Sequence, residues 1–232
     1  MNPDSPYAAF YRRSIEAPED FWAEQAQLID WQTPPSRILD DTRPPFVNWF
    51  VGGKTNLCHN AVDRHLAKLG DSPALIHVST ETGSERTYTF RQLHEEVQRT
   101  AASLLALGVR KGDRVLIYMP MIPQATFAML ACARIGAIHC VVFGGFASGA
   151  LASRIEDAAP KVVVSADAGS RGGKVVAYKP LLDEAIRISS HKPEAVLLTD
   201  RGLAPMDRVP GPDPLPHEGG PRPFCPPGAP AW

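Results

Sequence analysis

The sequence lacks any strong bias of charge, because 24 lysines and arginines stand against 25 aspartates and glutamates, for a formal net charge of −1. A near-neutral chain has no electrostatic surplus for nucleic acid or an anionic membrane, so neither is expected as a main partner. The sequence also has no basic start followed by an apolar run, and no stretch of about eighteen apolar residues. We therefore expect no signal peptide and no membrane span, and we predict a cytoplasmic location.

Cysteine is scarce as well. The four cysteines are Cys58, Cys132, Cys140 and Cys225. They form no CxxC pair, and the only neighbouring histidines are His59 and His139. We interpret all four as small buried hydrophobes or free thiols, with a metal site or a disulfide as the alternative. The sequence accordingly predicts no zinc site, no other metal site and no bound redox cofactor.

What the sequence does have is an alternation of strand-like and helix-like segments. The near-continuous apolar run at 114–119 is typical of a strand buried on both faces of a parallel sheet. The pattern predicts further strands at 137–143, 161–165 and 195–199, with helices at 124–135, 148–158 and 178–189. Such alternation produces right-handed crossovers, so the fold class is α/β, a parallel sheet with flanking helices.

Upstream of this alternation the pattern is less regular. Residues 1–60 are rich in aromatics and prolines and predict a wrapping extension with one helix at 18–29 and an irregular segment through the proline pairs near 34 and 44. Apolar spacing predicts a helix over 60–69.

A hairpin and a capped helix are expected next. Two β-prone runs, 74–78 and 86–89, are separated by a turn and predict a hairpin that contains His77, which we interpret as packing rather than chemistry. Thr89 and Gln92 have the spacing of a capping box, which predicts that a helix starts there.

Two glycine-rich loops follow successive expected strands, Phe143-Gly144-Gly145-Phe146 and Ser170-Arg171-Gly172-Gly173-Lys174. Glycine lets a backbone approach a ligand closely, and two cations three residues apart can pair with phosphate. In open parallel sheets ligands bind at the carboxyl ends of the strands, where both loops are expected. The alternatives stay open at this point: the second loop can be a plain solvated turn, and Phe143 can be either a wall for an adenine ring or a core aromatic.

These loops carry a resemblance that extends along the chain. Phe143–Phe146 and residues 165–174 together resemble the acetyl- and propionyl-CoA synthetases of the adenylate-forming superfamily, and above all its propionate:CoA ligases. Similar segments occur at 10–14, 21–24, 29–31, 55–60 and 118–123. The resemblance covers roughly residues 8–209 and corresponds to the N-terminal portion of such an enzyme.

The resemblance implies a domain plan and a set of substrates. Residues 1–60 resemble the acetyl-CoA synthetase type of N-terminal extension, and 61–209 resemble part of the large AMP-binding domain of the adenylate-forming fold. The implied reaction joins a short-chain carboxylate to CoA at the expense of ATP, with Mg²⁺ assisting, through an acyl-adenylate.

The same resemblance implies a CoA site. The loop Arg171, Gly172, Gly173 and Lys174 matches the family segment that holds the phosphate-bearing nucleotide end of CoA, and Phe143, Gly144 and Gly145 match the segment that lines its adenine pocket. One residue departs from the acetyl-CoA synthetases, which commonly have arginine where this chain has Lys174, so a point charge replaces a bidentate donor.

The family's catalytic motifs are not found in this sequence, so we predict no catalytic residue and an inactive fragment. A third of the residues from Leu203 onward are prolines, and 210–232 shows no periodicity. We interpret that tail as disordered or out of frame, with a native proline-rich tail as the alternative. Two other functions compete with the ligase fragment, namely a non-catalytic module that binds CoA or another nucleotide and an interaction protein that docks through the tail.

Overall fold

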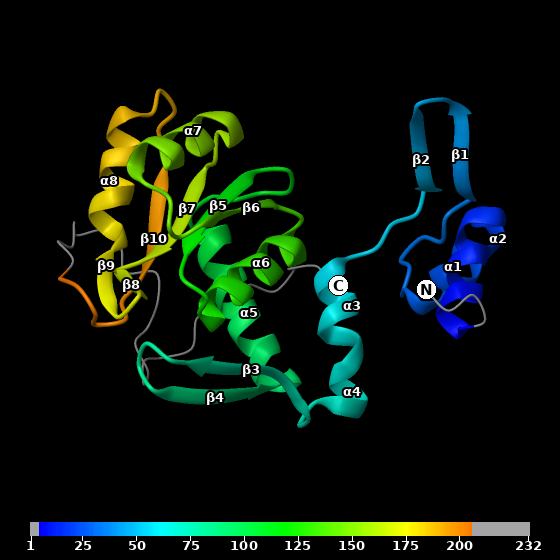
Figure 1. Ribbon diagram of the computed structural model, residues 1–232, viewed down its shortest axis with the longest axis horizontal. Coiled ribbons are helices and arrows are strands. Elements are labelled where there is room, and N and C mark those ends of the chain that lie inside the picture. Colours follow the sequence, from blue (N-terminus) through cyan, green and yellow to red (C-terminus); the bar gives the residue numbers. More distant parts are fainter. Residues whose placement is uncertain (1–4, 206–232) are drawn as a thin grey trace. The chain divides into compact units, whose positions relative to one another are not determined.

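The computed structural model describes residues 5–205 (Figure 1). The chain divides into two compact units, Met1–Asn60 and Ala61–Trp232, which are described separately. Within the described residues no helix is long and apolar enough to cross a membrane. The predicted tail, 210–232, lies outside the described residues.

The first unit contains two short helices and a hairpin. Helix α1 is Pro6–Glu16, α2 is Pro18–Gln25, the 3₁₀ turn η1 is Ala26–Leu28, and strands β1, Arg37–Arg43, and β2, Phe46–Val51, pair antiparallel. The sequence did not predict α1, which is capped by Ser5, and the helix expected at 18–29 changes to a 3₁₀ turn after Gln25. The irregular segment expected near the second proline pair is also wrong, because that pair forms the turn of the hairpin and the aromatic run behind it pairs as a strand.

A broken helix spans the boundary between the two units. In place of one helix over 60–69 the chain forms α3, Leu57–Ala61, then η2, Asp63–His65, and α4, Leu66–Leu69. The physical reason lies at Val62, whose φ of −129° leaves the helical range while its side chain is completely buried. Burial of this one side chain thus outweighs the helical periodicity.

The predicted hairpin and capped helix are confirmed. Strands β3, Pro73–Ser79, and β4, Ser84–Thr89, pair antiparallel, and α5, Phe90–Ala106, follows directly. The Thr89 hydroxyl accepts from the Gln92 N–H at 3.2 Å, and the Gln92 side chain accepts from the Thr89 N–H at 2.9 Å. The capping box therefore fixes where α5 begins.

The predicted α/β fold is confirmed by a four-stranded parallel sheet. Its strands are β5, Arg114–Met119, β6, Ile138–Phe143, β7, Val162–Ala166, and β10, Ala195–Thr199. Their order is β10-β7-β5-β6. The chain therefore runs from β5 to β6 on one side, then crosses to β7 on the other side of β5 and continues outward to β10. A reversal of this kind opens a crevice at the carboxyl ends of the two central strands.

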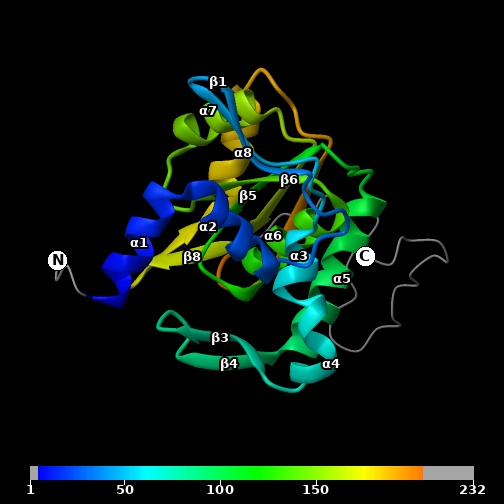
Figure 2. The same cartoon turned by 90° about the vertical axis from the view of Figure 1, so that its right-hand side faces the viewer.

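Helices cover both faces of this sheet (Figures 1 and 2). They are α6, Pro123–Ile135, α7, Ser148–Ala158, and α8, Tyr178–Ile188. Helices α7 and α8 pack on one face, where Leu116 of β5 and Val163 of β7 join Leu151, Ile155 and Leu182 in a buried cluster. Alternate residues of β5 point to the other face, toward α6, on which α5 packs, and are equally buried. Burial on both sides explains the continuous apolar run in the sequence.

A second small hairpin was not predicted. The segment expected to be a loop between β7 and α8 instead forms strands β8, Ala168–Arg171, and β9, Lys174–Ala177. Gly172 and Gly173 have φ of +57° and +75°, the positive values that both central residues of a type I′ turn require. The glycine pair therefore serves a tight hairpin turn, which the sequence interpretation had treated as an open loop.

Candidate functional site

The structure places both glycine-rich segments at the carboxyl edge of the parallel sheet. Phe143 is the last residue of β6 and lies opposite Met119, the last residue of β5. The β8–β9 hairpin starts at Ala168, directly behind the end of β7. Helices α7 and α8 both begin at this edge, so their free N–H groups and the positive ends of their dipoles lie here too.

Tyr178, the first residue of α8, joins the two segments. A Cβ built on Gly144 would lie 2.2 Å from the Tyr178 hydroxyl, and one built on Gly169 would lie 3.0 Å from it. The Tyr178 ring also stacks on Tyr118, with ring centroids 4.9 Å apart and planes inclined by 27°. Glycine at position 144 is thus required by a neighbouring side chain of the protein itself.

Tyr118 is hydrogen-bonded to the backbone of the first glycine-rich segment. Its hydroxyl donates to the carbonyl of Phe146 at 3.1 Å and approaches that of Gly144 at 3.4 Å. Burial, and next the neighbouring Tyr178 hydroxyl, raise the pKa of Tyr118 to about 12. Sequence reasoning missed both tyrosines, although Tyr178 stands at the start of the helix that follows a glycine-rich turn.

Phe143 is not part of the core, so the core-aromatic interpretation is wrong. Its side chain is 65% exposed, and its ring meets that of Phe146 edge to face at 5.8 Å. Phe146 packs against the buried cluster between sheet and helices, and Arg154 lies 5.8 Å from its ring. Phe146 therefore supports an exposed ring that a flat ligand can stack on.

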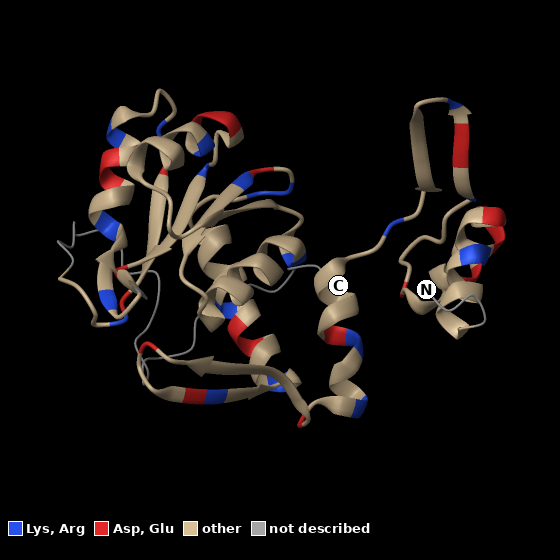
Figure 3. Ribbon diagram, in the orientation of Figure 1, with Lys and Arg blue, Asp and Glu red and all other residues tan. Residues whose placement is uncertain are grey.

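The hairpin brings the two predicted cations together in register. Arg171 and Lys174 occupy directly opposed positions on either side of the turn. Lys174 is exposed, while the side chain of Arg171 lies outside the described residues. A Cβ at Gly172 or Gly173 would meet no atom within 4 Å, so the tip of the hairpin faces open space. In Figure 3 the Lys and Arg positions of this hairpin are blue.

Asp167 orders the base of the hairpin. Its carboxylate is fully buried and accepts from the N–H groups of Leu203 at 2.7 Å and Ala204 at 3.2 Å. Its own carbonyl accepts from the Tyr178 N–H at 2.8 Å. Asp167 thus ties the end of β7 to the start of α8 and to the segment behind β10. Nothing in the local pattern of the sequence marked it.

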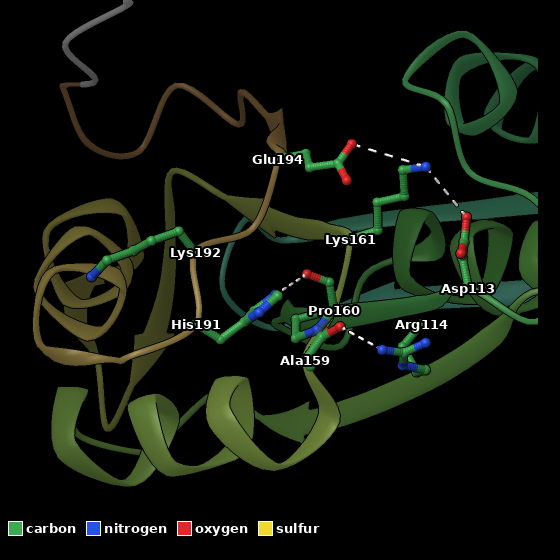
Figure 4. Close-up of a pocket in the computed structure, with 8 residues that line it drawn as sticks. All are labelled: Asp113, Arg114, Ala159, Pro160, Lys161, His191, Lys192 and Glu194. Atoms are coloured by element: carbon green, nitrogen blue, oxygen red, sulfur yellow. Dashed lines mark hydrogen bonds and ion pairs between the residues drawn. The ribbon is translucent and has the colours of Figure 1, made fainter.

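A polar cavity of about 240 Å³ lies at the opposite, amino edge of the sheet (Figure 4). Its lining residues are Asp113, Arg114, Ala159, Pro160, Lys161, His191, Lys192 and Glu194. Its cations are already engaged with main-chain carbonyls at the ends of helices: Arg114 donates to Ala158 at 2.9 Å, Lys161 to Gly108 at 2.9 Å, and Lys192 to Ser189 at 2.6 Å. These bonds cap helices, and we assign no ligand to the cavity.

Asp113 balances part of this charge. Its carboxylate accepts from the Arg110 N–H at 2.8 Å and lies 3.6 Å from Lys161. The Arg110 hydrogen bond and, beyond it, the charge of Lys161 hold the pKa of Asp113 below its usual value despite partial burial. The amino edge is therefore internally compensated.

The described cysteines fit their interpretation as thiols. Cys58, Cys132 and Cys140 are free, and the first two are fully buried. Burial, with a lesser effect of Cys140, raises the pKa of Cys132 to about 12. Cys225 lies outside the described residues. Across residues 5–205 no group of three or more His, Cys, Asp or Glu side chains is placed to hold a metal ion.

Comparison with known proteins places this architecture in a family. The pattern described as AMP-binding enzyme matches residues 62–222, and the one described as acetyl-coenzyme A synthetase N-terminus matches residues 7–61. The chain belongs to the AMP-binding enzyme family. The family match extends beyond residue 209, where we had expected the resemblance to end.

Individual relatives support the assignment to the AMP-binding enzyme family. Propionate–CoA ligase of Escherichia coli is 62% identical over 207 residues, covering 89% of this chain and 33% of the relative. The mitochondrial acyl-CoA synthetase short-chain family member 3 of Rattus norvegicus is 47% identical over 205 residues, covering 88% and 30%. The solved structure of acetoacetyl-CoA synthetase from Streptomyces lividans superposes with a TM-score of 0.74 at 30% identity, covering 89% of this chain and 34% of that one. The chain thus spans about a third of the length of these relatives and includes the part described as the acetyl-coenzyme A synthetase N-terminus.

Proposed function

We propose that the chain supplies the CoA-recognising part of an AMP-forming ligase that acts on propionate or acetate. In that reaction the carboxylate attacks the α-phosphate of ATP to give an acyl-adenylate and diphosphate, and the CoA thiol then displaces AMP to give the thioester. The observation that carries the proposal is that the Tyr178 hydroxyl lies against Gly144 of the first segment and against Gly169 of β8, the strand that leads to the second segment. Both segments follow strands at the edge where open parallel sheets bind ligands.

Each part of this surface suits one part of the nucleotide end of CoA. The opposed cations Arg171 and Lys174 would pair with its phosphate through charge-assisted hydrogen bonds. The exposed ring of Phe143 would stack on the adenine, and the backbone of Gly144 and Gly145 would approach it closely. Lys174 offers a point charge where a guanidinium would offer two parallel donors.

The chain is proposed to contribute binding and no catalytic group. Mg²⁺ would neutralise the charge of the ATP phosphates, and we propose no residue among 5–205 to hold it. A stand-alone CoA-binding module is not favoured, because the matching proteins are acyl-CoA ligases. We keep the extension at 1–60, the partial AMP-binding domain at 61–209 and a cytoplasmic location as parts of the proposal, with small molecules in place of nucleic acid or membrane as partners.

Calorimetric titration of the chain with CoA and with dephospho-CoA, which lacks the 3′-phosphate, tests the proposal. We expect saturable binding of CoA and about tenfold weaker binding of dephospho-CoA, the scale of one charge-assisted contact. In Arg171→Ala the two ligands should bind equally weakly. Arg187→Ala, which changes an exposed arginine paired with Glu184 on α8, is the matched control and should keep the difference. An absence of saturable CoA binding by the unaltered chain would overturn the proposal.

A further inference from the structure

The β8–β9 hairpin forms a two-stranded sheet of its own. Isolated hairpins of this size are marginally stable in water, so a hairpin whose backbone is to keep Arg171 and Lys174 in register needs support from outside. The edge of β8 that faces away from β9 provides the place for that support. Ser170 and Ala168, two residues apart in the strand, present their backbone groups on the same edge.

Two side chains bind that edge where a third strand would lie. The carboxylate of Glu81, in the turn between β3 and β4, accepts from the Ser170 N–H at 3.0 Å. The guanidinium of Arg201, in the segment behind β10, donates to the Ala168 carbonyl at 2.8 Å. The same guanidinium donates to Glu81 at 2.6 Å, which closes a ring of hydrogen bonds around the edge of β8.

The pair is shielded and electrically balanced. The side chain of Arg201 is 10% exposed and that of Glu81 is 25% exposed. Burial by itself would raise the pKa of Glu81, but the bonds from Arg201 and Ser170 and the charges of Arg201 and His77 together hold that pKa below its usual value. The carboxylate is thus ionised at neutral pH and matched by a cation, so it does not oppose an anion at the hairpin tip.

Arg201 is itself held in place. The segment that carries it is fixed at Leu203 and Ala204 by the buried carboxylate of Asp167, which also lies at the base of β8. The guanidinium therefore reaches the hairpin from an anchored backbone. Three segments far apart in the sequence meet at this point: the β3–β4 turn, the hairpin and the segment behind β10.

We propose that Glu81 and Arg201 are positioning residues that hold the β8–β9 hairpin in the conformation that presents its two cations to the phosphate of CoA. This inference rests on the proposed function. The pair touches no ligand. It raises the fraction of molecules whose hairpin is ready to bind, and apparent affinity scales with that fraction.

Two readouts on the full chain test the inference, hydrogen–deuterium exchange at Ser170 and calorimetric affinity for CoA. In Glu81→Gln and in Arg201→Met the Ser170 amide should exchange faster, and CoA should bind about tenfold more weakly if a tenth of the hairpins remain ordered. The double variant should be no weaker than either single one, because both changes break one unit. Glu85→Gln, an exposed carboxylate of β4, is the matched control and should change neither readout.

The outcomes separate this inference from the proposed function. If the unaltered chain binds no CoA, the proposed function fails. Exchange at Ser170 in the variants then still decides whether the Glu81–Arg201 pair orders the hairpin. If the unaltered chain binds CoA and Glu81→Gln binds it equally well, the positioning role is wrong and the proposed function stands. Arg201→Lys, which keeps the charge but cannot bridge Ala168 and Glu81 with one planar group, provides a second variant should Glu81→Gln fold poorly.

Discussion

The two edges of the parallel sheet contain the same kinds of side chain and use them in opposite ways. At the amino edge, where helices end, Arg114, Lys161 and Lys192 donate to main-chain carbonyls. At the carboxyl edge, where α7 and α8 begin, Lys174 is exposed on a hairpin that extends from the sheet. Helix ends with unpaired carbonyls attract cations, whereas helix beginnings leave cations available to anionic ligands.

The comparison also shows why a cavity is a poor guide to function here. The cavity of about 240 Å³ lies at the amino edge, among cations that already cap helices. The surface that we propose to bind CoA includes a hairpin tip that faces open space and an exposed aromatic ring. The following variants test whether the two edges really divide stability and binding between them, from the largest expected effect to the smallest.

Gly144→Ala should abolish the carboxyl-edge surface. The added methyl group would lie 2.2 Å from the Tyr178 hydroxyl, so the first loop and the start of α8 have to move apart. We expect a loss of about 1–3 kcal/mol in the free energy of unfolding, the usual cost of overpacking, together with loss of measurable CoA binding. Urea denaturation and calorimetry measure the two effects.

Gly149→Ala is the control for that change, because it adds the same methyl group nearby. A Cβ at Gly149, in the first turn of α7, meets no atom within 4 Å. It should stabilise the chain by about 0.4–1 kcal/mol by restricting the unfolded state, and leave CoA affinity unchanged. Equal effects of the two substitutions would contradict the role given to Tyr178.

Arg114→Met should separate stability from binding at the amino edge. The guanidinium bonds the carbonyls of Ala158 and Ala159, and Ala159 has a φ of +42°, a left-handed conformation that favours glycine. Removing the donors leaves these carbonyls unsatisfied and should lower the free energy of unfolding by about 1–3 kcal/mol.

CoA affinity should be unchanged in this variant, because Arg114 lies at the edge remote from the hairpin. Arg187→Met, which removes an exposed arginine of a surface ion pair, should leave the unfolding free energy nearly unchanged. A variant of Arg114 that weakened CoA binding at full stability would show that the two edges are coupled.

Tyr118→Phe should change how the stability of the chain depends on pH. Burial, and next Tyr178, raise the pKa of Tyr118 to about 12 from an unfolded value of 10.0. Its contribution to stability is therefore complete below pH 10 and is lost as the pH rises through 12. At pH 7 the free energy of unfolding of the variant should be about 1 kcal/mol lower, because the hydrogen bond from the hydroxyl to the Phe146 carbonyl is absent. Between pH 7 and 11 the free energy of unfolding should fall less in the variant than in the unaltered chain.

Urea midpoints at the two pH values measure this difference. Tyr7→Phe, at an exposed tyrosine of α1, should match the unaltered chain at both. Parallel pH profiles for Tyr118→Phe and the unaltered chain would mean that the Tyr118 hydroxyl titrates normally.

The local sequence pattern was enough to predict the parallel sheet. It did not predict the two hairpins that lie outside that sheet. The apolar run of β5 and the capping box at Thr89 were found because each depends on neighbours within a few residues. The hairpins β1–β2 and β8–β9 were missed because proline and glycine pairs were interpreted as irregular loops when they form tight turns. Turn chemistry of this kind depends on whether the flanking segments pair, which composition does not reveal.

The candidate site shows the same division. Phe143 and the glycine-rich segments could be named from the sequence, because a resemblance and the topology both point to the ends of β6 and β7. The residues that hold them could not, because Glu81 lies 89 positions from Ser170 and 120 from Arg201, and their contacts exist only in the folded chain. An exposed Phe143 was equally beyond prediction, since exposure depends on what packs beside the end of β6.

Lys174→Arg should produce the smallest effect and a gain. At the position opposite Arg171 a guanidinium can donate two parallel hydrogen bonds to a phosphate, where an ammonium offers a point charge. CoA should bind about threefold more tightly, with little change for dephospho-CoA. Lys179→Arg is the control, since Lys179 is paired with Asp183 on α8 at 2.6 Å. A gain for both ligands would indicate a general increase in attraction to anions, whereas a gain for CoA alone would place the 3′-phosphate beside residue 174 and distinguish this available cation from the helix-capping cations of the amino edge.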